Sequence, residues 1–126
     1  MATVLITTAL VLAIIYAVPF LVYALGTVVA DLKPPEGSSP ARFLISVLVS
    51  KVGMAFAFVF IFFIARTSLS GQWQLYALAW LLMLVIGEVG QAIGPGYSRK
   101  EAIAGVISEA IYVPLSAYAA SRMIGL

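Results

Sequence analysis

The sequence contains no cysteine and no histidine, and only 12 of its 126 residues carry a formal charge. Without cysteine and histidine the chain cannot form a disulfide, a thiolate or imidazole zinc site, or a Ser-His-Asp or Cys-His catalytic set. Its net charge of +2 comes from a few scattered residues, not from the basic stripe of a nucleic-acid-binding protein. We therefore expect no metal, no cofactor, no nucleic-acid partner and no catalytic residues.

Apolar residues make up 63% of the chain, and charged residues only 10%. Soluble domains are about 45–50% apolar and about 25% charged, so the composition excludes an ordinary soluble protein. Four apolar stretches cover residues 4–30, 43–65, 75–93 and 102–124. Each reaches or nearly reaches the roughly 20 residues that a helix needs to cross a bilayer. The sequence predicts an all-α, integral membrane, four-transmembrane-helix bundle, with helices at about 4–30, 41–65, 73–93 and 99–124 of a single membrane domain, 1–126.

The second stretch has phenylalanine on all sides of the expected helix. These rings belong to Phe56, Phe58, Phe60, Phe62 and Phe63. A helix of a soluble bundle would show polar residues at 3.6-residue spacing on its outer face, whereas here the phenylalanines go all round the segment. This pattern predicts that the phenylalanine rings face lipid.

Basic residues are distributed unequally between the two ends of the expected bundle. With four spans, both termini lie on one side, and the loops 31–42 and 94–101 lie on the other. Those loops contain Lys33, Arg42, Arg99 and Lys100, against two basic side chains on the side of the termini. The positive-inside rule then places the termini outside and the two loops in the cytoplasm, with the reverse or a dual insertion as alternatives. The four loop cations are candidates for contact with lipid head groups.

Three charged residues lie inside the expected spans: Lys51, Glu88 and Glu109. Each is nine residues from a residue at the end of its span, and therefore about 13 Å along its helix from the side of the two basic loops. Since the second and fourth helices run one way and the third runs back, all three reach one depth. We call these three residues the charged layer.

A charged layer inside a membrane is costly. Each charge near the centre of a span costs about 2.5–3.5 kcal/mol, or on the order of 8–10 kcal/mol for three unpaired charges. The expected arrangement places Lys51 between Glu88 and Glu109, facing inward. Because one cation faces two carboxylates, the second carboxyl is expected to keep its proton. Alternatively, Lys51 extends its ammonium group toward the nearer head groups.

Other polar side chains are expected near this layer. Tyr23, Gln91, Ser108 and Tyr112 reach a similar depth or share a helix face with one of its members. On the fourth helix, small and polar residues repeat at three- and four-residue spacing and predict a side that faces protein. That side comprises Glu101, Gly105, Ser108, Glu109, Tyr112 and Ser116.

Two hypotheses about function follow. The first is a non-catalytic structural or accessory subunit of a homo-oligomer or of a complex with other membrane subunits, held together by the charged layer. The alternative is a small oligomeric, proton-coupled transporter or channel that uses Glu88 or Glu109. A third possibility, a lipid-modifying enzyme, would need a polar cleft at head-group depth that the sequence does not indicate.

Overall fold

The computed structural model describes residues 2–29, 40–94 and 99–125, and within these ranges all side chains except those of residues 27, 29 and 40–44. The described residues form four helices. They are α1 (Ala2–Val29), α2 (Pro40–Leu69), α3 (Trp73–Ile93) and α4 (Arg99–Ile124). All four are long and apolar enough to cross a membrane, which confirms the prediction of an all-helical chain with four such helices.

Helix α2 continues four residues beyond the expected end at residue 65. In this last part of the helix the side chain of Arg66 folds back on the preceding turn. Its guanidinium lies 3.9 Å from the centroid of the Phe63 ring and donates a hydrogen bond to the Phe63 carbonyl. The helix ends at Ser70 and Gly71, whose positive φ angles of 51° and 82° turn the chain toward α3.

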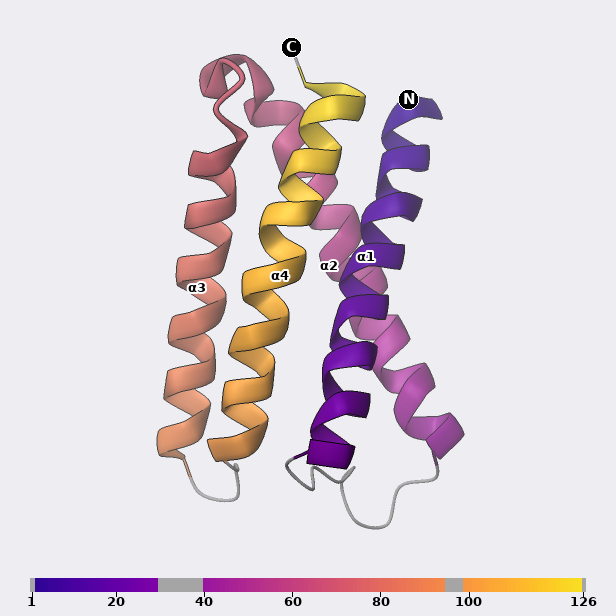
Figure 1. The fold of residues 1–126 in the computed structure, drawn as a ribbon. Coiled ribbons are helices and arrows are strands. Elements are labelled where there is room, and N and C mark those ends of the chain that lie inside the picture. Colours follow the sequence, from indigo (N-terminus) through magenta and orange to yellow (C-terminus); the bar gives the residue numbers. More distant parts are fainter. Residues whose placement is uncertain (1, 30–39, 95–98, 126) are drawn as a thin grey trace.

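Helix α4 is at the centre of the bundle. It packs extensively against α1 on one side and α3 on the other, and α2 packs mainly against α1 (Figure 1). Helices α2 and α3 follow each other directly in the chain, yet they make few contacts. Figure 1 shows why: α2 crosses behind the other helices at an angle and approaches α3 only near their connecting turn. Both termini lie at the end of the bundle where this turn is found.

The two ends of the bundle are packed differently. We call residues 2–15, 55–83 and 112–125 the termini half, and residues 16–29, 45–54, 84–94 and 99–111 the loop half. The buried side chains of the termini half come from all four helices: Val4, Thr7, Val11, Ile15, Ala55, Phe58, Val59, Phe62, Tyr76, Ala77, Tyr112, Val113, Ser116, Ala117 and Ala120. Among the described residues of the loop half, those that are buried all belong to α4: Ala102, Ala104, Gly105, Ser108 and Glu109. More side chains are therefore buried in the termini half. Toward the loop end α2 diverges from α3 and α4, whereas α3 and α4 stay side by side (Figure 1).

An aromatic cluster closes the termini half. The rings of Phe58 and Phe62 each lie 5.0 Å from the ring of Tyr76, edge to face, and Trp80 lies 5.3 Å from Phe58. The hydroxyl of Tyr76 donates a hydrogen bond to the Phe58 carbonyl. The prediction that every phenylalanine of α2 faces the outside is therefore wrong for Phe58 and Phe62, which are buried, because α3 supplies aromatic partners that sequence spacing cannot reveal.

Candidate functional site

The three residues of the charged layer lie near one another, one each on α2, α3 and α4. The carboxyl groups of Glu88 and Glu109 form a hydrogen bond with each other. The ammonium group of Lys51 interacts electrostatically with both carboxyl groups, and its Nζ atom lies 5.1 Å from the centroid of the Tyr112 ring. The expected arrangement had the ammonium between the two carboxyls. In the structure the carboxyls meet directly, and the ammonium lies over an aromatic face instead.

The carboxyl group of Glu109 is the innermost part of the layer. The residue is only 6% exposed, and its Oε1 atom is fully buried without a hydrogen-bond partner within the described ranges. Lys51 and Glu88 are half-buried. A buried acceptor without a partner is costly, so the site holds more acceptors than its donors satisfy. This local excess of carboxyl oxygens is the main chemical feature of the site.

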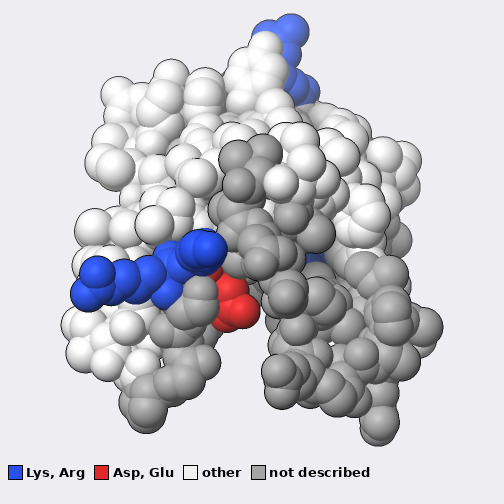
Figure 2. Space-filling model, turned by 60° about the horizontal axis from the view of Figure 1, so that its bottom comes forward, with Lys and Arg blue, Asp and Glu red and all other residues white. Residues whose placement is uncertain are grey.

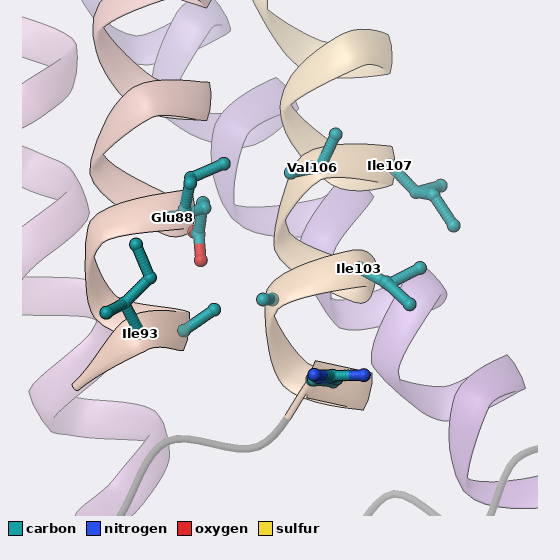
Figure 3. Close-up of a pocket in the computed structure, with 9 residues that line it drawn as sticks. Glu88, Ile93, Ile103, Val106 and Ile107 are labelled. Atoms are coloured by element: carbon teal, nitrogen blue, oxygen red, sulfur yellow. The ribbon is translucent and has the colours of Figure 1, made fainter. Parts of the chain in front are cut away.

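A glycine on α4 makes room for the side chain of Glu88. A Cβ atom added at Gly105 would lie 2.5 Å from Glu88 Oε1 and 2.7 Å from Glu88 Cδ. The carboxyl group thus rests directly on the backbone of α4, one turn from Glu109. Figure 3 shows Glu88 extending from α3 toward α4. A larger residue at position 105 would displace this carboxyl from its present place.

Of the supporting polar residues that the sequence indicated, two tyrosines lie near the layer. Tyr112 is buried beneath Lys51. Tyr23, on α1, is half-buried and close enough to interact electrostatically with Glu88 and Glu109. Each of the four helices therefore contributes a polar side chain to this level of the bundle.

The other two supporting residues are not directed at the layer. Ser108 is buried, but its hydroxyl donates a hydrogen bond to the Ala104 carbonyl of its own helix, 2.8 Å away. Gln91 is exposed on α3, although Glu88 is half-buried three residues earlier. The sequence places Gln91 on the same helix face as Glu88, but α3 packs mainly against α4, and only Glu88 is turned toward this neighbour.

Two of the four loop cations fall within the described side chains. Arg99 and Lys100 are exposed in the first turn of α4. Lys33 and the side chain of Arg42 lie outside the described residues. Seen from the loop end, basic side chains adjoin acidic ones (Figure 2). The two described cations therefore lie at the loop end of the bundle.

A groove of about 560 Å³ runs along the outside of the bundle between α3 and α4. Its inner wall contains Glu88, its loop end contains Arg99, and the other lining side chains are apolar (Figure 3). Those apolar residues are Val89, Ala92, Ile93, Ala102, Ile103, Val106 and Ile107. The charged layer can thus be reached from one side of the bundle. Sequence reasoning missed this groove, because it depends on how two antiparallel helices are spaced.

Two buried hydroxyl groups of the termini half have no counterpart in the expected site. The hydroxyl of Thr7 donates to the Thr3 carbonyl, 2.6 Å away, and the Ser116 hydroxyl has no hydrogen-bond partner among the described residues. Thr7 stands in an almost uniformly apolar stretch, where spacing gives no signal for it. In the part of the chain that the structure describes, no three acidic side chains are grouped as ligands for a metal ion.

Comparison of the chain with protein-family models, with curated proteins and with solved structures finds no match.

Proposed function

We propose that the chain is a multi-pass integral membrane protein that acts as a non-catalytic structural subunit of a membrane assembly. The observation that carries this proposal is the outer face of α3. Only Tyr76 and Ala77 are buried among the 21 residues of this helix. On its exposed side, a Cβ atom added at Gly87 or Gly90 would meet nothing within 4 Å. Gln91 is exposed beside them.

Small residues on an exposed membrane helix allow a second helix to approach closely, and a side-chain amide stabilises such a contact through a hydrogen bond. In lipid the amide of Gln91 would have no polar partner, which is unfavourable. A partner helix against Gly87 and Gly90 provides one. We call Gly87, Gly90 and Gln91 the outer face of α3. The charged layer has a separate role in this proposal: it links α2 to α3 and α4 of the same chain, since α2 packs little against either of these helices.

The native chain has no cysteine, so a single introduced cysteine gives an unambiguous test. We expect Gly90→Cys to form a cross-linked product in membranes, either a dimer of the chain or an adduct with another membrane protein. Ala24→Cys, at an exposed position of α1 also in the loop half, is the matched control and should cross-link much less. Equal cross-linking at both positions, or none at either, would contradict assembly through the outer face of α3.

The same approach tests the proposed orientation, in which the termini are outside and the loops 31–42 and 94–101 are cytoplasmic. A membrane-impermeant thiol reagent added to intact cells should label Ser70→Cys, at the turn between α2 and α3. Lys100→Cys should be labelled only after the membrane is permeabilised. The opposite pattern would reverse the orientation.

A second candidate function is proton-coupled transport, which is favoured by the contact between Glu88 and Glu109. Two carboxyl groups that share a hydrogen bond need one proton between them, and the groove gives access to Glu88. In liposomes with a pH gradient, this function predicts proton-linked flux that is lost in Glu88→Gln and Glu109→Gln. Glu101→Gln, a carboxyl in the first turn of α4, is the matched control and should keep the flux. If both layer variants retain the flux, or only dissociate the assembly, this candidate fails.

A further inference from the structure

The groove between α3 and α4 has the form of a site for an amphiphile. Along α4 it extends from Arg99 to Ile107, which is about 12 Å of helix. Apolar side chains line it between these points, and it is open to one side. Its volume of about 560 Å³ is within the range of small-molecule sites, roughly 300–1,000 Å³. None of the residues that form the outer face of α3 lines the groove. A ligand in the groove and a partner helix on the outer face could therefore be bound at the same time.

The charges of the groove select among possible occupants. Arg99 lines the loop end, and Lys100 is exposed next to it in the first turn of α4. Arg99 at the entrance disfavours a cationic amphiphile and favours an anionic head group. The apolar walls below it disfavour a small soluble anion and favour a hydrocarbon chain.

The position of Glu88 is compatible with such an occupant. This carboxyl rests against Gly105, which is six residues and about 9 Å deeper along α4 than Arg99. It is hydrogen-bonded to Glu109, so it is not an isolated anion facing the groove. An anionic head group at Arg99 would therefore be separated from the carboxyl pair by most of the length of the groove.

We propose that the groove between α3 and α4 binds an anionic phospholipid, with its phosphate at Arg99 and one acyl chain between Ala92 and Val106. The site is at the loop end of the bundle. A bound acyl chain would pack against the apolar side chains of α3 and α4 that line the groove.

The test uses the full chain in nanodiscs of phosphatidylcholine, into which phosphatidylglycerol is titrated while thermal unfolding is followed. Phosphatidylglycerol should stabilise the native chain in a saturable manner, because a ligand that binds the folded state raises the unfolding temperature. Arg99→Gln should weaken the apparent affinity roughly fivefold, the effect of removing one basic residue from a lipid surface site. Arg122→Gln is the matched control: it removes a cation from the opposite end of the same helix and should leave the affinity unchanged.

A second pair of variants tests the groove itself. Ala92→Trp places a large ring inside it and should abolish saturable stabilisation, whereas Ala79→Trp, at an exposed position of α3 outside the groove, should not. The proposal is overturned if phosphatidylcholine stabilises as well as phosphatidylglycerol, if Arg99→Gln and Arg122→Gln have equal effects, or if Ala92→Trp retains the response. It is also overturned if glycerol phosphate alone stabilises the chain to the same extent, because the site would then bind a free phosphate.

Discussion

The termini half and the loop half of this bundle are held together by different interactions. In the termini half, side chains of all four helices are buried, and an aromatic cluster joins α2 to α3. In the loop half, the described buried residues all come from α4, and the charged layer links α2 to α3 and α4, against which α2 packs little. The comparison indicates that polar contacts can replace packing where one membrane-length helix diverges from its neighbours. Each prediction below changes one half and leaves the other intact.

The largest effect is expected at the core of the termini half. Phe58→Ala should lower the free energy of unfolding by about 3 kcal/mol, the lower end of the range for loss of a buried phenylalanine, because its partners Phe62, Tyr76 and Trp80 would border a cavity. Phe56, on the same helix, is 51% exposed, and Phe56→Ala should cost far less. Denaturant titration of the purified variants in mixed micelles measures both. Equal costs would mean that the termini half is not closed as described.

In the loop half, removal of the cation should have the next largest effect. Lys51→Met should destabilise the chain by about 2 kcal/mol, because the two carboxyl groups then lose their positive partner. Lys100→Met, which removes an exposed lysine, is the matched control and should change the free energy of unfolding by less than about 0.5 kcal/mol. If the two variants are equally stable, Lys51 does not stabilise the layer.

Gly105→Ala should lower the free energy of unfolding by about 1–2 kcal/mol. The carboxyl group of Glu88 rests against Gly105, and the new methyl group would force it to move. At Gly53 an added Cβ atom meets nothing within 4 Å, so Gly53→Ala should be neutral or stabilise the helix by up to about 1 kcal/mol. The difference in unfolding free energy between the two variants is the quantity to measure. A stabilising effect of Gly105→Ala would show that Glu88 is not in this place.

The smallest effect concerns one hydrogen bond of the termini half. Tyr76→Phe keeps the ring and removes the hydroxyl that donates to the Phe58 carbonyl. This change should lower the free energy of unfolding by about 1 kcal/mol in the same denaturant titration. Tyr118→Phe alters an exposed hydroxyl and serves as the control, for which no measurable change is expected. If Tyr76→Phe is as stable as its control, the aromatic cluster depends on ring packing alone.

The sequence was sufficient to predict four apolar helices, because length and composition alone decide whether a helix can span a bilayer. It also indicated which helix faces protein: the small and polar stripe of α4, from Gly105 to Ser116, is largely buried. These inferences needed only local patterns.

Features that depend on the arrangement of helices could not be predicted. The direction of Gln91 depends on α3 having one main neighbour, and the burial of Phe58 depends on Tyr76. Hydropathy does not distinguish a phenylalanine that faces lipid from one that faces a neighbouring helix. The direct contact of Glu88 with Glu109 likewise depends on the close approach of α3 at Gly105.

Glu88 and Glu109 meet within one chain and act as a unit in the loop half. A double-mutant cycle tests it most directly, with the free energy of unfolding measured for Glu88→Gln, Glu109→Gln and the double variant. A direct contact predicts that the two changes are not additive, with a coupling energy of about 1 kcal/mol or more. Additivity of the two changes would contradict the claim, since it would mean that the carboxyl groups do not touch.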